Sequence, residues 1–388
     1  MGYRILFVCC LLIGLLGCSK STPDIKTTEI PTLKDSLFPD YTLFSLESEQ
    51  EIFGLEDKAQ NFVREAVWPF ANDESSIRGL LRQIFDHSEM GLLYRSEANT
   101  TANETFLNQS ANCLSLSIMT YAMAESAGFK AQFYEVQIPE YWTRREGYSL
   151  LNGHINLRLR LADEIGTTRL YDEFVDVDFD PQVIRNHFPR IPISKNLVVA
   201  MYYTNKGADA LIANSYSQAY AYFRRAAVME PEFASVWVNL GVLYRIKGDF
   251  EASEASYHQA LAINDENLTA WENLAILYQH MQQPERAEEI LASVERKRQD
   301  NPFYHFILGE QAFDEGLYDE ALAHYRKAMR IDKNRHEVLF GMGKTFYELG
   351  DISKAKDYLE MAARKAISEQ DEQRYLSKLS VLQSKNMM

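Results

Sequence analysis

The sequence predicts an α+β domain followed by an all-α solenoid of repeated helix pairs. Two observations predict this fold class. Helical patterns give way to alternating strand patterns between residues 46 and 195, and a period of 34 residues runs through the region 199–388. The chain has 388 residues, which is enough for two or three domains, and its 46% of hydrophobic and 24% of charged residues are typical of a folded protein.

The net charge limits the class of partner. The chain has 40 Lys and Arg residues against 55 Asp and Glu residues, which gives a formal charge of −15. Binding to nucleic acid rests on clustered Lys and Arg side chains, and the longest basic run is only 296–298. We therefore expect no nucleic acid among the partners.

Residues 1–17 have the pattern of a secretion signal. Arg4 precedes an apolar core, 5–16, that is too short to cross a bilayer as a helix. The core leads into the run LLGC, which ends at Cys18 and resembles the lipobox of bacterial lipoproteins. The resemblance implies that Cys18 is lipidated and, because Ser19 follows it, that the protein is anchored in the outer membrane and faces the periplasm. The alternative is an ordinary signal peptide with an accidental cysteine.

Residues 18–45 are expected to form a flexible tether. Pro23, Pro31 and Pro39 lie among Ser, Thr and Asp, and such a stretch cannot bury enough apolar surface to fold alone. A flexible chain of this length reaches roughly 25–30 Å, so it would hold a domain just off a membrane.

The region 46–195 lacks the 34-residue period and predicts the α+β domain. Helices are expected at 47–67, 73–87 and 112–127, and strands at 131–136, 154–161 and 170–179. Gly128 is placed to end the third helix. The strand 154–161 alternates strictly, which points its apolar side chains into the core and leaves His154 on the polar face.

Cys113 is the cysteine that is expected to remain free. Cys9 and Cys10 leave with the signal and Cys18 carries the lipid, so no internal disulfide is possible. Cys113 lies at the start of the third expected helix. The unpaired backbone N–H groups and the helix dipole at that place favour a thiolate.

His154, Asp176 and Asp178 complete the candidate chemistry. His154 begins the alternating strand, and both carboxylates lie on the next long strand, opposite its valines. A thiol, an imidazole and a carboxylate in this order supply a nucleophile, a base and a group that orients the base.

The motifs around these residues resemble the transglutaminase-like superfamily. The resemblance rests on the run NCLS at Cys113 with AESAGFKA after it, on GHIN at His154, and on FVDVDFDP, which ends the last strand. It implies a papain-like fold with a triad of Cys113, His154 and Asp178, and a thiol-dependent amide hydrolase or acyltransferase. Asp176 is the alternative acid. The chain departs from the family at Asn156, where Trp is common.

Each of these residues also has a purely structural interpretation. Cys113 would pack inside a helix, His154 would lie on an exposed strand face, and both carboxylates would be solvated. The domain would then be a degenerate binding module, and the protein a non-catalytic scaffold for assembly in the cell envelope. The histidines show no spacing typical of metal ligands and there is no glycine loop for phosphate, so we expect neither a metal nor a cofactor.

Small residues carry the period of 34 residues in the second half of the chain. They are Gly207, Gly241, Ala275, Gly309 and Gly343. Sixteen positions after each lies a large residue, and these are Phe223, Tyr257, Leu291, Tyr325 and Leu359. Two helices approach closely where small residues meet, and large side chains fill the remaining space. The pattern resembles five copies of the tetratricopeptide repeat, which implies antiparallel helix pairs and a groove for a protein or peptide partner. A capping helix is expected after about residue 368.

Overall fold

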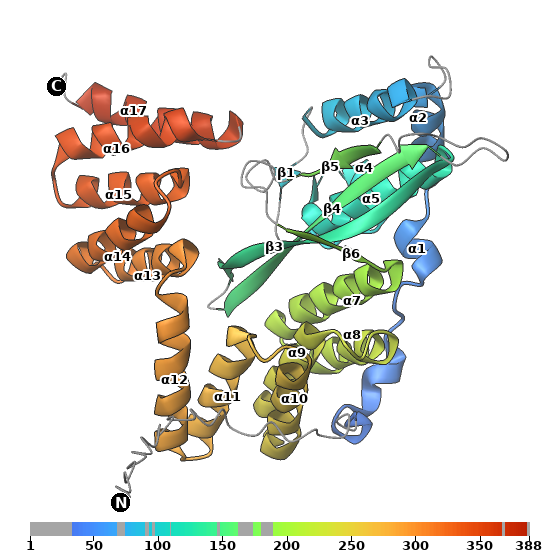
Figure 1. Ribbon diagram of the computed structural model, residues 1–388, viewed down its shortest axis with the longest axis horizontal. Helices are drawn as coiled ribbons and strands as arrows, with labels where there is room; N and C mark the ends of the chain where they lie inside the picture. The colour runs from blue at the N-terminus through green and yellow to red at the C-terminus, as the bar shows by residue number, and fades with distance from the viewer. Residues whose placement is uncertain are drawn as a thin grey trace, which may run out of the picture.

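The computed structural model describes most of the chain from residue 33 onward (Figure 1). The described residues are 33–67, 74–89, 93–94, 98–108, 110–145, 148–161, 174–179, 189–366 and 369–385. The expected signal peptide, Cys18 and the first part of the expected tether lie outside them. None of the helices described is both long enough and apolar enough to cross a membrane.

The described strands of the α+β domain form a four-stranded antiparallel sheet and a short second pair. The sheet has the order β5-β4-β3-β6 and consists of β3 (Phe129–Arg145), β4 (Tyr148–Leu161), β5 (Phe174–Val177) and β6 (Arg190–Ile193). The parallel pair consists of β1 (Leu93–Tyr94) and β2 (Ser110–Ala111). The strand expected at 131–136 is one arm of a long hairpin with β4, and β6 is a strand that the sequence did not indicate.

Five helices belong to this domain among the described residues. They are α1 (Glu49–Phe53), α2 (Asp57–Val67), α3 (Glu74–Glu89), α4 (Ala102–Asn108) and α5 (Cys113–Ser126). The helix expected at 47–67 is divided into α1 and α2 because the backbone is extended at Gly54. Gly128, with a φ of +82°, lies two residues after the end of α5, where it was expected to end the helix.

The core of the domain lies between α5 and the sheet. α5 packs against both β3 and β4, and nearly every side chain from Leu114 to Ala124 is buried. The buried apolar side chains of β4 follow the predicted alternation and are Ile155, Leu157, Leu159 and Leu161. Apart from Tyr121, the side chains of α5 that reach solvent lie at its two ends. Cys113 is the first residue of this helix.

The segment 33–45 packs against the solenoid. It contains two 3₁₀ helices, η1 (Asp35–Leu37) and η2 (Pro39–Leu43). Phe38 lies between them, is 1% exposed, and stacks on Tyr220 with 4.3 Å between ring centroids. Asp35 pairs with Arg224 at 2.8 Å. The flexible tether predicted from the composition therefore does not extend to residue 45, because Phe38 finds an aromatic site on the solenoid.

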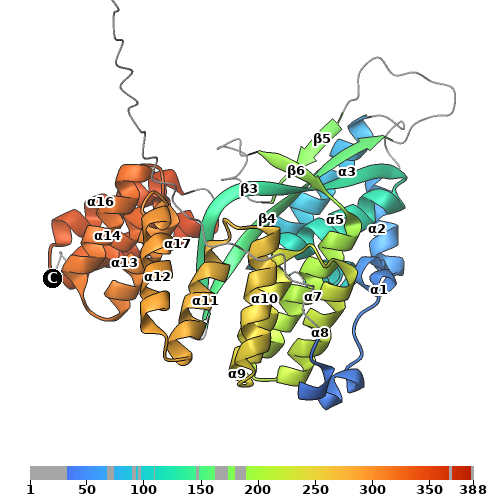
Figure 2. The same cartoon turned by 60° about the horizontal axis from the view of Figure 1, so that its bottom comes forward.

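In the part of the chain described from residue 195 onward, the solenoid has five antiparallel helix pairs and a final helix (Figures 1 and 2). The pairs are α7 (Lys195–Ile212) with α8 (Tyr216–Met229), α9 (Ala234–Ile246) with α10 (Phe250–Ile263), α11 (Leu268–His280) with α12 (Pro284–Arg298), α13 (Pro302–Asp314) with α14 (Tyr318–Ile331), and α15 (His336–Glu348) with α16 (Ile352–Lys365). The last helix, α17 (Glu369–Lys385), packs on α16 where the capping helix was expected. The long strand β3 contacts α13, so the α+β domain also meets the fourth repeat.

Close contact between small and large residues holds the two helices of a pair together. A Cβ added at Gly241 would lie 2.4 Å from Cε1 of Tyr257, and one added at Gly309 would lie 2.4 Å from Cε1 of Tyr325. Both tyrosine side chains are fully buried. The small residues of the 34-residue period therefore mark the points where paired helices touch, as the spacing predicts.

Candidate functional site

The candidate site lies where the start of α5 meets β4 and the end of β5. Cys113 is the first residue of α5, His154 lies in β4, and Asp178 follows directly after β5. The strands β4 and β5 pair antiparallel, with Leu157 opposite Val177. Strand pairing therefore brings His154 near Asp178, and the packing of α5 on β4 adds Cys113.

His154 and Asp178 form a buried hydrogen-bonded pair. Nε2 of His154 lies 2.6 Å from Oδ1 of Asp178, and the two residues are 2% and 7% exposed. Asn156 donates a hydrogen bond from Nδ2 to the other carboxylate oxygen, Oδ2, at 3.2 Å. His154 and Asn156 are two residues apart in one strand, so their side chains point to the same face. Two groups thus hold the Asp178 carboxylate in place.

The Cys113 thiol lies close enough to the His154 ring to raise its pKa. Because Asp178 occupies Nε2, the ring nitrogen left for the thiol is Nδ1. Cys113 is half-buried, whereas the ring is buried. The thiol therefore has an imidazole on one side and partial access to solvent, both of which favour a reactive cysteine.

The pKa of His154 is raised from its ordinary value of 6.5 to about 10. Burial by itself lowers this pKa, because it penalises the charged ring. The hydrogen bonds to Asp178 and Cys113, together with the negative charge of these groups, more than offset the effect of burial. The ring is therefore protonated at neutral pH.

Asp176, the alternative acid, is engaged by arginines instead of by His154. Its Oδ1 accepts a hydrogen bond from Nε of Arg158 at 2.8 Å, and its Oδ2 accepts one from Nη1 of Arg190 at 2.8 Å. Alternation along a strand would place Asp176 and Asp178 on one side, but β5 ends at Val177. Asp178 therefore lies outside the strand, and Asp178, instead of Asp176, contacts the His154 ring.

The start of α5 is fixed by a side-chain cap. Oδ1 of Asn112 accepts a hydrogen bond from the backbone N–H of Ser115 at 2.9 Å. Nδ2 of Asn112 donates to Oδ1 of Asn99 at 2.7 Å. Because Asn112 directly precedes Cys113, this cap fixes the backbone from which the thiol projects.

Two features of the site differ from the sequence-based expectation. His154 was expected to be free on the polar face of its strand, but it is buried and its ring contacts the Asp178 carboxylate. Asn156 departs from the family pattern, yet its amide donates a hydrogen bond to Asp178. Its position two residues after His154, on the same face of the strand, was the feature of the sequence that could have indicated this role. In the described parts of the chain, no group of three or more His, Cys, Asp and Glu side chains is placed to hold a metal ion.

Several solved structures resemble the chain. YrrB, described as a TPR protein with an unusual peptide-binding site, has 20% sequence identity and a TM-score of 0.26, over 46% of this chain and 92% of YrrB. PilF of Pseudomonas aeruginosa has 17% identity and a TM-score of 0.27, over 49% of this chain and 94% of PilF. MamA of AMB-1 has 22% identity and a TM-score of 0.24, over 44% of this chain and 94% of MamA. At these TM-scores the likeness carries no argument about function.

Family comparison identifies the repeats. No curated protein matches the chain. Sequence models of the tetratricopeptide repeat match residues 204–268, 244–306 and 312–376. These matches coincide with the five helix pairs and with the 34-residue period. Residues 204–306 and 312–376 therefore consist of tetratricopeptide repeats.

Proposed function

We propose that the α+β domain is a transglutaminase-like amide hydrolase or acyltransferase that uses Cys113 as its nucleophile. The observation that carries this proposal is the position of the His154 ring, which lies between the Asp178 carboxylate and the Cys113 thiol. A thiol and a carboxylate that both act on one imidazole are the groups that nucleophilic acyl transfer uses. The half-buried state of Cys113 leaves room for a substrate to approach.

The reaction follows from the order of these groups. The Cys113 thiolate, paired with the protonated ring of His154, attacks the carbonyl carbon of an amide. The C–N bond breaks, His154 gives its proton to the leaving amine, and a thioester remains on Cys113. Water then cleaves the thioester to release a carboxylic acid, or an amine cleaves it to form a new amide. Hydrolysis is the favoured outcome, because it needs no pocket for a second substrate.

Acylation of the full chain by p-nitrophenyl acetate tests this function. The thiolate displaces p-nitrophenolate and becomes acetylated, and mass spectrometry of the peptide that contains Cys113 measures the thioester. We expect an adduct on Cys113 in the wild type, a much slower reaction in His154→Gln, and none at this position in Cys113→Ala. Acetylation that occurs only on lysines, or at the same rate in His154→Gln, would overturn the proposal.

A pH profile supplies a second readout that does not depend on an acyl donor. Iodoacetamide reacts with thiolates, and a free cysteine ionises near pH 8.5, so an activated Cys113 should be alkylated at half the maximal rate well below about pH 8.5. The His154→Gln variant should move this midpoint back toward that of a free thiol. Identical profiles in the two proteins would show that the ring does not activate the sulfur.

Partner binding by the repeats is a second function, and the repeats themselves favour it. Tetratricopeptide repeats form concave surfaces that hold other proteins or peptides. The repeats would bring a partner to the α+β domain, or they would act alone as a scaffold for envelope assembly. Cys113→Ala separates the two cases, because it abolishes the cellular role of an enzyme and leaves that of a scaffold intact.

The anchor at Cys18 belongs to the same proposal. The run LLGC that ends at Cys18 supports lipidation and a position in the outer membrane, facing the periplasm. In cells fed a palmitate analogue, the wild type should incorporate the label and sediment with outer membranes, and Cys18→Ala should do neither. An unlabelled wild type would contradict the anchor without affecting the chemistry proposed for Cys113.

A further inference from the structure

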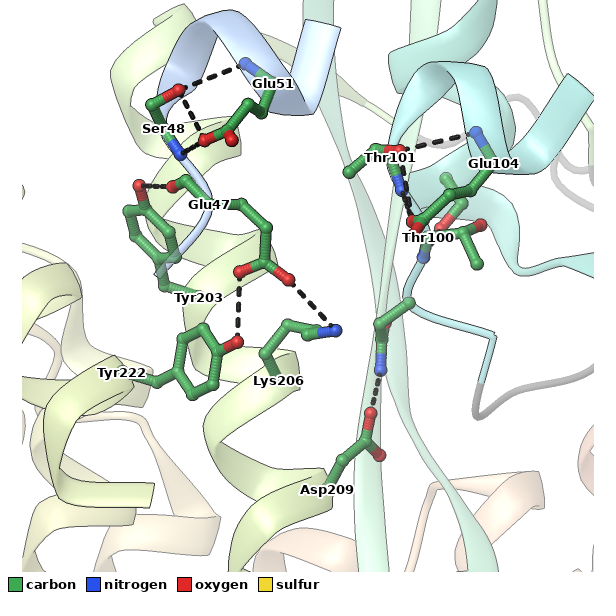
Figure 3. Close-up of polar contacts among 12 residues, drawn as sticks. Glu47, Ser48, Glu51, Thr100, Thr101, Glu104, Tyr203, Lys206, Asp209 and Tyr222 are labelled. Atoms are coloured by element: carbon green, nitrogen blue, oxygen red, sulfur yellow. Dashed lines mark hydrogen bonds and ion pairs between the residues drawn. The ribbon is translucent and has the colours of Figure 1, made fainter. Parts of the chain in front are cut away.

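A chain of side-chain hydrogen bonds connects the first solenoid helix, α7, to the start of α5. Oδ2 of Asp209 accepts a hydrogen bond from Nδ2 of Asn99 at 2.7 Å, and Figure 3 shows Asp209 making this contact across the gap between the two ribbons. Oδ1 of Asn99 accepts from Nδ2 of Asn112 at 2.7 Å. Oδ1 of Asn112 accepts from the backbone N–H of Ser115. The chain thus passes through Asn112, which directly precedes Cys113.

The carboxylate of Asp209 at one end and the backbone N–H of Ser115 at the other fix the direction of every bond in this chain. An ionised carboxylate can only accept, so Asn99 must turn its NH₂ group toward Asp209 and its carbonyl toward Asn112. Asn112 must then turn its own NH₂ group toward Asn99 and its carbonyl toward the helix. The side chain that caps α5 is therefore held in place, through Asn99, by a residue of the solenoid.

Burial makes this chain costly to break. Asn99 and Asn112 are 9% and 6% exposed, and a buried amide that loses its partner destabilises the conformation that buries it. The same loop is tied to α5 a second time, because Oγ of Ser115 donates to the carbonyl of Ala98 and accepts from the backbone N–H of Thr100. A change at Asn99 is thus transmitted directly to the first turn of α5.

Asp209 is specific to the first repeat. The equivalent positions in the four later repeats, at successive intervals of 34, are Leu243, Leu277, Gln311 and Thr345. None of these is acidic, so the repeat fold does not itself require a carboxylate there. The acid occurs in α7, whose partner in this contact is the loop beside the start of α5.

We propose that Asp209, a residue of the tetratricopeptide solenoid, is a positioning residue for Cys113. It acts through Asn99 and Asn112 and fixes the helix start that places the thiol against His154. The inference rests on the proposed function, since Cys113 must be the nucleophile for its position to matter. The first repeat then completes the site of the α+β domain.

The test measures the pH profile of Cys113 alkylation by iodoacetamide in the full chain. In Asp209→Ala we expect the rate at neutral pH to fall by about two- to tenfold, as for the loss of a helix cap, and the midpoint to move to higher pH. Asp209→Asn should lie between Ala and the wild type, because its amide oxygen still accepts but no longer forces the direction of the chain.

Lys206→Ala is the matched control. Lys206 lies on α7 three residues before Asp209 and pairs with Glu47 at 3.2 Å, so its loss removes a contact of the same helix but not the chain to Cys113 (Figure 3). Its alkylation profile should match that of the wild type. If Asp209 had a purely structural role, Asp209→Ala would lower the melting temperature without moving the midpoint of the alkylation profile, and the proposal would be overturned.

The two proposals fail in different ways. A wild-type profile in Asp209→Ala, with acetylation of Cys113 intact, overturns the role of Asp209 and leaves the enzyme standing. A shift in Lys206→Ala as large as that in Asp209→Ala also overturns it. Absence of Cys113 acetylation in the wild type overturns the enzyme itself.

Discussion

Replacing Asp178 with Asn is expected to lower the pKa of His154 by about 2–4 units. The wild-type pKa is raised to about 10 against the effect of burial. Removing one partner of a buried ion pair costs about 3–5 kcal/mol, which corresponds to a fall of about 2–4 units, so the pKa of His154 should drop to between about 6 and 8. The Cys113 hydrogen bond remains and prevents a larger fall.

NMR of selectively labelled histidine rings measures this shift. The chain has eight histidines, and His154→Gln identifies the resonance of His154 by its absence. Asp176→Asn is the control, because this exposed carboxylate pairs with arginines and its loss should leave the titration of His154 unchanged. The reasoning would be refuted by an unchanged midpoint in Asp178→Asn, or by equal shifts in both variants.

The same shift links the stability of the fold to pH. The folded pKa of His154 lies above the ordinary value of 6.5, so the stabilisation from its protonated ring is complete below pH 6.5 and disappears as the pH rises through about 10. The whole difference corresponds to about 5 kcal/mol. In urea unfolding, Asp178→Asn should lose this contribution at a lower pH than the wild type does, whereas Asp176→Asn should follow the wild type.

Two further predictions concern the solenoid. Gly241→Ala should lower the free energy of unfolding by about 1–3 kcal/mol in a urea titration, because the new methyl group meets the buried Tyr257 ring. Gly153→Ala is the control and should be neutral, because nothing lies within 4 Å of the methyl group that it adds. Phe38→Ala should weaken the attachment of the N-terminal segment by about 3–5 kcal/mol, because the ring is buried against Tyr220. Limited proteolysis should then cut this segment first, and unchanged cleavage would contradict its docking.

The solenoid could be predicted from the sequence because each contact that defines a repeat is local. Gly241 and Tyr257 are sixteen residues apart, and their contact recurs 68 residues later as Gly309 and Tyr325. Where a stabilising contact spans less than one repeat, its residues recur with the period and can be recognised. The N-terminal segment shows the converse, since Phe38 is buried by Tyr220, and nothing in its local composition indicates that partner.

The candidate site falls between these two cases. The residue types and their order along the chain indicated Cys113 and His154, and strand alternation left Asp176 and Asp178 equivalent. Only the end of β5 at Val177 distinguishes the two, because Asp178 there leaves the strand and meets the ring. The residue at which β5 ends is set by tertiary packing, and no local sequence pattern predicts it to within one residue.

By itself, the sequence determined the repeat architecture, the small-to-large contacts within helix pairs and the apolar face of β4, because periodic burial leaves a periodic pattern of residues. Tertiary structure alone decided which carboxylate meets His154, where the N-terminal segment lies, and that Asp209 reaches the cap beside Cys113. Asp209 and Asn99 are 110 residues apart in the chain. A hydrogen bond between such distant residues depends on how two domains pack, and a single pair of polar residues leaves no periodic trace in a sequence.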